Sequence, residues 1–161
     1  MIHRDIKSDN IFCTKDGQIK LADLGLSVCL TQQQAFRKTK SGTYNFLSPE
    51  IIRNGPYSIE VDIWAFGAFI HELGTGKPPF MNPGNKSVFD AICGDPIPRV
   101  RNRTALYNDL LHKCMDRDIT TRLTIEGILE HEYLEGAEDL RQNWVDDFQQ
   151  YVDRQTRNSI M

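Results

Sequence analysis

The sequence lacks the features that mark membrane-spanning and nucleic-acid-binding proteins. Its apolar runs are far shorter than the roughly 20 residues that cross a bilayer as a helix, so we expect no membrane span. Its net charge of −3 offers no general attraction for nucleic acid or for an acidic membrane. Internal repeats and low-complexity tracts are missing from its 161 residues, which leaves one ordinary globular domain as the expectation.

Cysteine is scarce and scattered. No Cys-x-x-Cys pair occurs among the four cysteines, which argues against a zinc site and against a disulfide framework; they are Cys13, Cys29, Cys93 and Cys114. We therefore expect reduced residues, several of them buried, in a cytoplasmic protein.

Strand patterns are confined to the first quarter of the chain. Residues 11–14 are short and apolar, residues 15–17 (Lys-Asp-Gly) are typical of a turn, and residues 18–22 alternate between polar and apolar side chains. This arrangement predicts a β-hairpin. The polar stretch over residues 23–42 has no clear period and predicts a long surface loop, a kind of segment that often carries function.

The rest of the chain has helical patterns, which makes the predicted fold mainly α. Ser58 can cap a helix, and residues 61–73 leave almost no polar face. A helix that is apolar nearly all round is a buried one. We therefore predict a buried central helix that ends at the Gly-Thr-Gly of residues 74–76.

Shorter amphipathic patterns predict helices over roughly residues 87–93, 104–115 and 124–131. The connection between the first two carries three arginines, Arg99, Arg101 and Arg103. We interpret this basic connection as a solvated loop, with a substrate-docking role as the sharper alternative.

The C-terminal stretch has a different pattern. From residue 135 on, large apolar residues recur at helical spacing among polar ones, namely Leu140, Trp144, Phe148 and Tyr151 with Val152. This predicts an amphipathic helix that either packs back on the domain or binds a partner. We accordingly divide the chain into a domain over residues 1–134 and a helical tail over residues 135–161.

The residues best suited to chemistry gather in the run His-Arg-Asp-Ile-Lys-Ser-Asp-Asn of residues 3–10. Phosphoryl transfer to a hydroxyl needs a carboxylate that orients the nucleophile, a cation near the phosphoryl oxygens, and hard oxygen ligands for a metal. Asp5, Lys7 and Asn10 are residues of these three kinds, and Asp23 adds a carboxylate directly after the hairpin. The hairpin would fold Asn10 and Asp23 back onto one site.

These residues resemble the catalytic loop and the metal-binding segment of protein kinases, and the resemblance extends over about residues 2–134. It implies a protein-kinase C-terminal lobe in which Asp5 is the catalytic base and Lys7 contacts the transferring phosphate. Asn10 and Asp23 are then implied to hold Mg²⁺, with ATP as the other cofactor. Lysine two residues after the catalytic aspartate is typical of serine/threonine kinases, so protein Ser and Thr hydroxyls are the implied substrates.

Residues 42–50 resemble the kinase segment that ends in Ala-Pro-Glu, with Ser48 in place of the alanine. In this segment, the resemblance implies that Thr43 contacts Asp5 and Lys7 in the substrate-facing loop. Such a contact would tie two distant parts of the chain together at the catalytic base.

Residues 62–67 resemble the start of the kinase central helix, where Asp62 is implied to hold the backbone of the catalytic loop by hydrogen bonds. Arg122 matches the arginine that pairs with the glutamate of Ala-Pro-Glu, which is Glu50 in this chain. We therefore predict a buried Glu50–Arg122 salt bridge, in which loss of either partner would strand a charge.

Among kinases, the PAK-like branch of the sterile-type kinases resembles the chain most, and the NIMA-related kinases are the runner-up because they share Ser-Pro-Glu. In such kinases the arginine before the catalytic aspartate pairs with a phosphate on the activation loop. This implies that Arg4 pairs with a phosphorylated Thr39. An upstream activating kinase or a small GTPase is the implied regulator of the full-length protein.

The resemblance also implies an N-terminal lobe with a glycine-rich loop and a strand lysine, and the sequence contains neither before Asp5. We expect a piece of a longer kinase, inactive alone, whether cut short or incompletely read from its gene. Part of its core should be exposed, because the helix before the catalytic loop is missing. The alternative is a non-catalytic, kinase-like interaction module that is complete as given.

Overall fold

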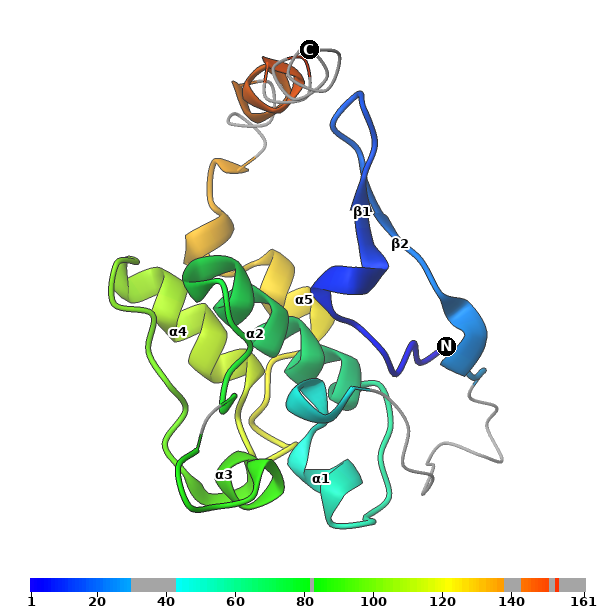
Figure 1. Ribbon diagram of the computed structural model, residues 1–161, viewed down its shortest axis with the longest axis vertical. Coiled ribbons are helices and arrows are strands. Elements are labelled where there is room, and N and C mark those ends of the chain that lie inside the picture. The colour runs from blue at the N-terminus through cyan, green and yellow to red at the C-terminus, as the bar shows by residue number, and fades with distance from the viewer. Residues whose placement is uncertain (30–42, 82, 138–142, 151–152, 154–161) are drawn as a thin grey trace.

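The fold is helical with one projecting hairpin, as a computed structural model of residues 1–29, 43–81, 83–137, 143–150 and 153 shows (Figure 1). Strand β1 (Ile11–Cys13) pairs antiparallel with β2 (Ile19–Leu21), and Ile11 lies opposite Leu21. Gly17 in the connecting turn has a φ of 76°, a conformation that favours glycine. The hairpin predicted from the sequence is therefore present.

Helix α2 (Glu60–Thr75) runs through the middle of the lobe and ends at Gly76, whose φ of 74° allows the left-handed turn that closes it. Its start differs from the prediction. Ile59, not Ser58, is the capping residue, and no side chain caps the helix. The predicted Ser58 cap was wrong, because Ser58 offers its backbone carbonyl to the Val61 N–H rather than its side chain.

Helix α4 (Ala105–Cys114) packs along α2 and completes the main core. Trp64 and Ala68 of α2 and Leu111 of α4 have no exposed surface, and Met115 fills the space beside Gly67. The central helix is not buried along its whole length, however, since Leu73 near its C-terminus is 61% exposed. The helix is thus a buried post only over its first three turns.

Each of three shorter helices begins directly after a residue whose side chain caps it. Ser87, Thr104 and Thr124 each accept a hydrogen bond from a backbone N–H in the first turn of the helix that follows. These helices are α3 (Val88–Gly94), α4 and α5 (Ile125–Leu129), at the positions predicted. The remaining helical pieces are α1 (Pro49–Ile52) and the 3₁₀ turns Ser8–Asn10, Leu24–Leu26, Tyr44–Phe46 and Glu132–Leu134.

The four cysteines are all free thiols. Only Cys114 among them is buried, so the expectation that several would be buried was wrong; Cys29 is exposed, and Cys13 and Cys93 are half-buried. Burial in the α2–α4 interface raises the pKa of Cys114 to about 12. That thiol is therefore a packing group.

Residues 143–150 form a helix, as the amphipathic pattern predicts, while Leu140, Tyr151 and Val152 lie outside the described residues. This helix contacts the turn of the hairpin. A Cβ placed on Gly17 would come within 2.9 Å of Val145 Cγ2, and Figure 1 shows the helix beside the hairpin tip. Trp144 stacks on Phe148 and stays 42% exposed.

An apolar groove of about 220 Å³ opens between α2, α5 and Ile6, which lies just before the 3₁₀ turn Ser8–Asn10. Its walls are mostly isoleucine, leucine and phenylalanine, among them Ile6, Phe66 and Leu129. None of the described helices is both long and apolar enough to cross a membrane.

The ion pair predicted between Glu50 and Arg122 is present. Arg122 donates from NH1 to Glu50 Oε1 at 2.7 Å and from NH2 to Oε2 at 3.0 Å. The Arg122 side chain has no exposed surface, lies 5.3 Å from the centre of the Trp64 ring, and also donates to the Asp116 and Glu60 carbonyls. The pair therefore fixes α1 to the start of α2 through a fully desolvated guanidinium.

We expect Glu50→Ala to lower the free energy of unfolding by about 3–5 kcal/mol, because it leaves a buried guanidinium without its counter-charge. Urea denaturation of the purified chain measures this change. As a control, Lys86→Ala removes the exposed ion pair with Asp95 and should cost less than about 1 kcal/mol. Equal losses in the two variants would contradict the assignment of Glu50–Arg122 as a buried structural pair.

Candidate active site

One buried carboxylate holds the backbone of the loop that carries the predicted catalytic residues. Asp62 accepts the His3 N–H on Oδ2 at 2.7 Å and the Arg4 N–H on Oδ1 at 2.9 Å. Burial raises the pKa of Asp62, and these two hydrogen bonds offset only part of that effect. The loop is thereby fixed to the first turn of α2, the arrangement predicted for Asp62.

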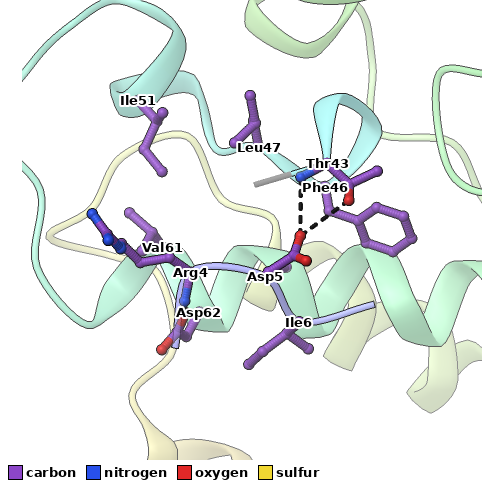
Figure 2. A pocket seen from close by; sticks show the side chains of 10 residues that line it. Arg4, Asp5, Ile6, Thr43, Phe46, Leu47, Ile51, Val61 and Asp62 are labelled. Atoms are coloured by element: carbon purple, nitrogen blue, oxygen red, sulfur yellow. Dashed lines mark hydrogen bonds between the residues drawn. The ribbon is translucent and has the colours of Figure 1, made fainter. Parts of the chain in front are cut away.

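Asp5 lies where the loop, the segment after residue 42 and α2 meet, and its side chain points towards Thr43 (Figure 2). Its Oδ1 accepts from the Thr43 N–H at 3.1 Å and from the Thr43 hydroxyl at 3.0 Å. Its Oδ2 accepts from Lys7 Nζ at 2.8 Å and from Asn10 Nδ2 at 3.0 Å. Four donors thus hold one carboxylate in a single orientation.

Lys7 and Thr43 also contact each other. The Lys7 ammonium donates to Thr43 Oγ1 at 2.8 Å, and that hydroxyl in turn donates to Asp5. Burial alone would raise the pKa of Asp5, but the hydrogen bonds from Lys7 and Thr43 together with the Lys7 charge bring that pKa below its ordinary value. The contacts predicted among the three residues are therefore present, and Asp5 is ionised at neutral pH.

The hairpin brings Asn10 and Asp23 to the same end of the site. The Ala22 N–H donates to the Asn10 carbonyl at 2.8 Å, so Asp23 directly follows the residue paired with Asn10. The Asn10 amide nitrogen donates to the Asp5 carbonyl at 2.8 Å as well as to its carboxylate. The amide oxygen of Asn10 is then the atom left to accept a hydrogen or to bind a cation.

The donor set suits a hard divalent cation. An amide oxygen from Asn10 and a carboxylate from Asp23 are ligands that Mg²⁺ accepts. Within the described residues, no group of three or more His, Cys, Asp or Glu side chains could hold a metal ion unaided. A cation bound by Asn10 and Asp23 would therefore need further oxygen ligands, such as phosphate oxygens or water, which is the usual mode for Mg²⁺.

Two residues of the site have strained backbones that sequence reasoning missed. Arg4 has a φ of 71° and Asp23 a φ of 61°, in the left-handed region that non-glycine residues seldom adopt. At Asp23, the side chain compensates by accepting the Gly25 N–H at 3.1 Å. Such strain is often found at functional sites, where the surrounding contacts enforce it.

His3 also has a position that the sequence did not reveal. Its Nδ1 accepts the Asp5 N–H at 3.3 Å, which leaves Nε2 as the protonated nitrogen that donates to the Ala22 carbonyl at 3.1 Å. The ring therefore bridges the loop that carries Asp5 and the residue before Asp23. The only indication in the sequence that His3 belongs to the site was its place in the His-Arg-Asp motif, which assigned no role to the histidine.

Arg4 points away from Asp5 in Figure 2. Its Nε donates to the Leu26 carbonyl at 2.5 Å and its NH1 to the Tyr57 hydroxyl at 3.3 Å. Thr39, the predicted phosphorylation site and partner of Arg4, lies outside the described residues.

A cavity of about 10 Å³ is lined by the loop around Asp5, by Thr43 and by α2. It has room for about one water molecule. The cavity is therefore too small to admit a larger ligand.

Comparison with known proteins bears on this geometry. The family model for the protein kinase domain matches residues 1–134, which contain every predicted site residue. The chain is 37% identical over 140 residues to the serine/threonine-protein kinase pakC of Dictyostelium discoideum, a match that covers 84% of this chain and 29% of the relative.

Two further relatives are of the same kind. The chain is 34% identical over 143 residues to the serine/threonine-protein kinase PAK 1 of Mus musculus, which covers 87% of this chain and 26% of that protein. It is 37% identical over 140 residues to pakB of Dictyostelium discoideum, covering 84% of this chain and 16% of the relative. The chain thus spans less than a third of the length of these relatives, and the resemblance to PAK-like kinases is confirmed.

The opposite pKa shifts of the two aspartates give a direct test. In a carboxyl-carbon NMR titration, Asp5 should titrate below 3.8 and Asp62 above it. Lys7→Met should raise the pKa of Asp5 and leave that of Asp62 unchanged, which makes Asp62 the internal control. An Asp5 midpoint above that of Asp62 would contradict the arrangement.

The same shift predicts a pH window. Because the pKa of Asp5 is lower in the folded chain than its unfolded value of 3.8, the stabilisation that Asp5 contributes is present above pH 3.8. It is lost as the pH falls through the folded-state pKa. The stability difference between the native chain and Lys7→Met should shrink over that interval.

Proposed function

The chain belongs to the protein kinase domain family, and we propose that it supplies the catalytic loop and substrate-facing segment of a serine/threonine protein kinase. The reaction transfers the γ-phosphate of ATP to a Ser or Thr hydroxyl of a protein. The observation that carries this proposal is the Asp5 carboxylate, ionised and held by Thr43, Lys7 and Asn10.

Asp5 orients the substrate hydroxyl and accepts its proton. A carboxylate of lowered pKa is a weak proton acceptor. The main contribution of Asp5 is therefore to position the oxygen of the substrate hydroxyl for in-line attack on the γ-phosphate. Lys7 lies 2.8 Å from Asp5 Oδ2 and also contacts Thr43, which places a cation beside the attacking oxygen. In the reaction it stabilises the charge on the transferring phosphoryl group.

Asn10 and Asp23 are the proposed ligands of Mg²⁺. The ion, when bound with ATP, neutralises phosphate charge. The hydrogen bonds of Asn10 to Asp5 keep its amide oxygen turned away from the base. Asp23, which directly follows the residue paired with Asn10, supplies a carboxylate as the second oxygen ligand.

A second candidate is a non-catalytic interaction module. The exposed apolar groove lined by Ile6, Phe66 and Leu129 favours it, because exposed apolar surface of this kind often binds other proteins. Under this alternative the chain binds a partner and transfers no phosphate. The activity of Asp5 variants separates the two possibilities.

We expect Asp5→Asn to lower the rate of phosphoryl transfer by about a hundredfold or more, because the amide can neither accept the proton nor pair with Lys7. The measurement is transfer of labelled γ-phosphate from ATP to a library of Ser/Thr peptides. It uses the longest protein product that carries this sequence, with the 161-residue chain in parallel. The shorter chain should show little transfer and weak nucleotide binding.

The matched control is Asp95→Asn, since Asp95 is also paired with a lysine but lies outside the site. It should leave the rate unchanged. Unaltered transfer by Asp5→Asn would remove Asp5 from the mechanism. Absence of transfer in every form of the protein would favour the interaction module.

Regulation of the whole protein is also a proposal. We place the activating phosphate on Thr39 and its counter-charge on Arg4, with an upstream kinase or a small GTPase as the trigger. The guanidinium of Arg4 already contacts the Leu26 carbonyl and the Tyr57 hydroxyl. Those contacts hold its position near the start of the loop that carries Thr39.

Phosphopeptide mapping of the active protein should therefore find phosphate on Thr39, and Thr39→Val should lower its activity. Phosphorylation adds nearly two negative charges, which can order a loop through an arginine. Thr31→Val, at the other end of the same loop, is the control and should have no effect. Full activity with Thr39 unmodified would refute the assignment.

A further inference from the structure

Three arginines surround a hollow that the proposed function does not use. The hollow has a volume of about 570 Å³ and is lined by Arg99, Arg101 and Arg103, with Val100 and Asn108 between them. We call it the basic hollow. A volume of this size suits a few side chains of a bound peptide, and none of its lining residues belongs to the candidate active site.

The backbone of the basic hollow is held firmly. Asn108 of α4 accepts the Val100 N–H at 2.8 Å and donates to the Val100 and Thr104 carbonyls at 3.1 and 3.0 Å. Val100 is 2% exposed and lies so close to Gly74 that a Cβ there would come within 2.8 Å of it. The arginines therefore project from a rigid support, which lowers the entropy lost when a ligand binds.

Within the part of the chain that the structure describes, the arginines of the hollow have no acidic partner. Among the described residues, no ion pair joins Arg99, Arg101 or Arg103 to a carboxylate, whereas Lys7, Lys86 and Arg122 each have one. Asp109, an acidic residue on α4, is already engaged by Lys113 at 2.7 Å and by His131 at 3.1 Å. The Arg103 guanidinium lies over the ring of Tyr107, 5.6 Å from its centre.

A further source of positive potential lies at the same place. Thr104 caps the ten-residue helix α4, and a helix N-terminus carries a partial positive charge. Guanidinium groups bind carboxylates through paired hydrogen bonds, which lysine cannot match. Three arginines beside a helix start therefore form a site for several carboxylates at once.

We propose that the basic hollow binds an acidic segment of a partner protein, with Asp and Glu carboxylates paired to the arginines. A protein fits better than a nucleic acid, because the chain as a whole has a charge of −3 and the arginines line one hollow rather than a track along a phosphate backbone. In Figure 1 the α3–α4 connection lies at the left edge of the lobe and the hairpin at the right.

This proposal does not depend on phosphoryl transfer. An acidic segment could belong to a substrate or to a regulator, and in either case binding is measurable without ATP. Failure of the kinase assay would therefore not count against the binding of an acidic segment. Failure of the binding test would likewise not count against phosphoryl transfer.

The test is fluorescence anisotropy of a labelled ten-residue peptide rich in Asp and Glu, titrated with the 161-residue chain. We expect saturable binding that weakens as salt is added. The triple variant Arg99→Gln, Arg101→Gln, Arg103→Gln should weaken it by roughly tenfold or more, on the scale of three exposed charge pairs. The same peptide with Asn and Gln in place of its acids should not bind.

The matched control removes three positive charges elsewhere, through Lys15→Gln, Lys20→Gln and Lys77→Gln, all at exposed positions. This variant has the same net charge as the arginine variant and should bind within about twofold of the native chain. Circular dichroism melts should show both variants folded, and Arg101→Gln alone provides a milder form if the triple variant melts early.

Three results would overturn the proposal. The acidic peptide could fail to bind, or both triple variants could weaken binding equally, which would indicate a general charge effect. Alternatively, a single-stranded oligonucleotide or vesicles of anionic lipid could bind more tightly than the peptide through the same arginines. That last result would assign the basic hollow to a different class of partner.

Discussion

Two hydrogen bonds to one buried carboxylate position the whole candidate site. Asp62 accepts the backbone N–H groups of His3 and Arg4, which precede it by 59 and 58 positions in the chain. Because Asp62 lies on α2, whose neighbouring side chains form the core, the loop that carries Asp5 shares the rigidity of that core. Without this anchor, neither the strained backbone of Arg4 nor the position of Asp5 would be held, since a short loop cannot enforce them alone.

A second set of contacts joins the loop to the segment that would face a substrate. Thr43 receives a hydrogen bond from Lys7 and donates one to Asp5, so its hydroxyl is used as both acceptor and donor. Further along, Glu50 pairs with the buried Arg122 across 72 positions. The segment over residues 43–50 is thus fixed at one end to Asp5 and at the other to the helical core. Its placement relative to Asp5 follows from these two attachments.

The sequence predicted most of the secondary structure and the side-chain contacts of the site, but not the backbone conformation at Arg4 and Asp23. The hairpin and the helices α3 to α5 depend on local sequence pattern and were predicted from it. The Glu50–Arg122 pair was predicted from the resemblance to kinases, because neither residue alone marks a buried ion pair. The start of α2 was misplaced by one residue, because the helix begins without the side-chain cap on which the prediction relied. The strain at Arg4 and the bridging ring of His3 were missed because both residues are held by contacts with distant segments. The strain at Asp23 was missed because no sequence pattern marks a positive φ at a residue other than glycine. The solvent exposure of most cysteines was misjudged for the same reason, since burial is a tertiary property.

The buried thiol of Cys114 has a consequence for how the motions of this lobe could be followed. Because burial raises the pKa of Cys114 to about 12, its thiol stays protonated and unreactive at neutral pH. The thiol is also enclosed by the helices that form the core, so an alkylating reagent gains access only when α2 and α4 separate. Its labelling rate would then report the free energy of that separation. The three accessible thiols of the same chain would be labelled without it and would calibrate the reagent.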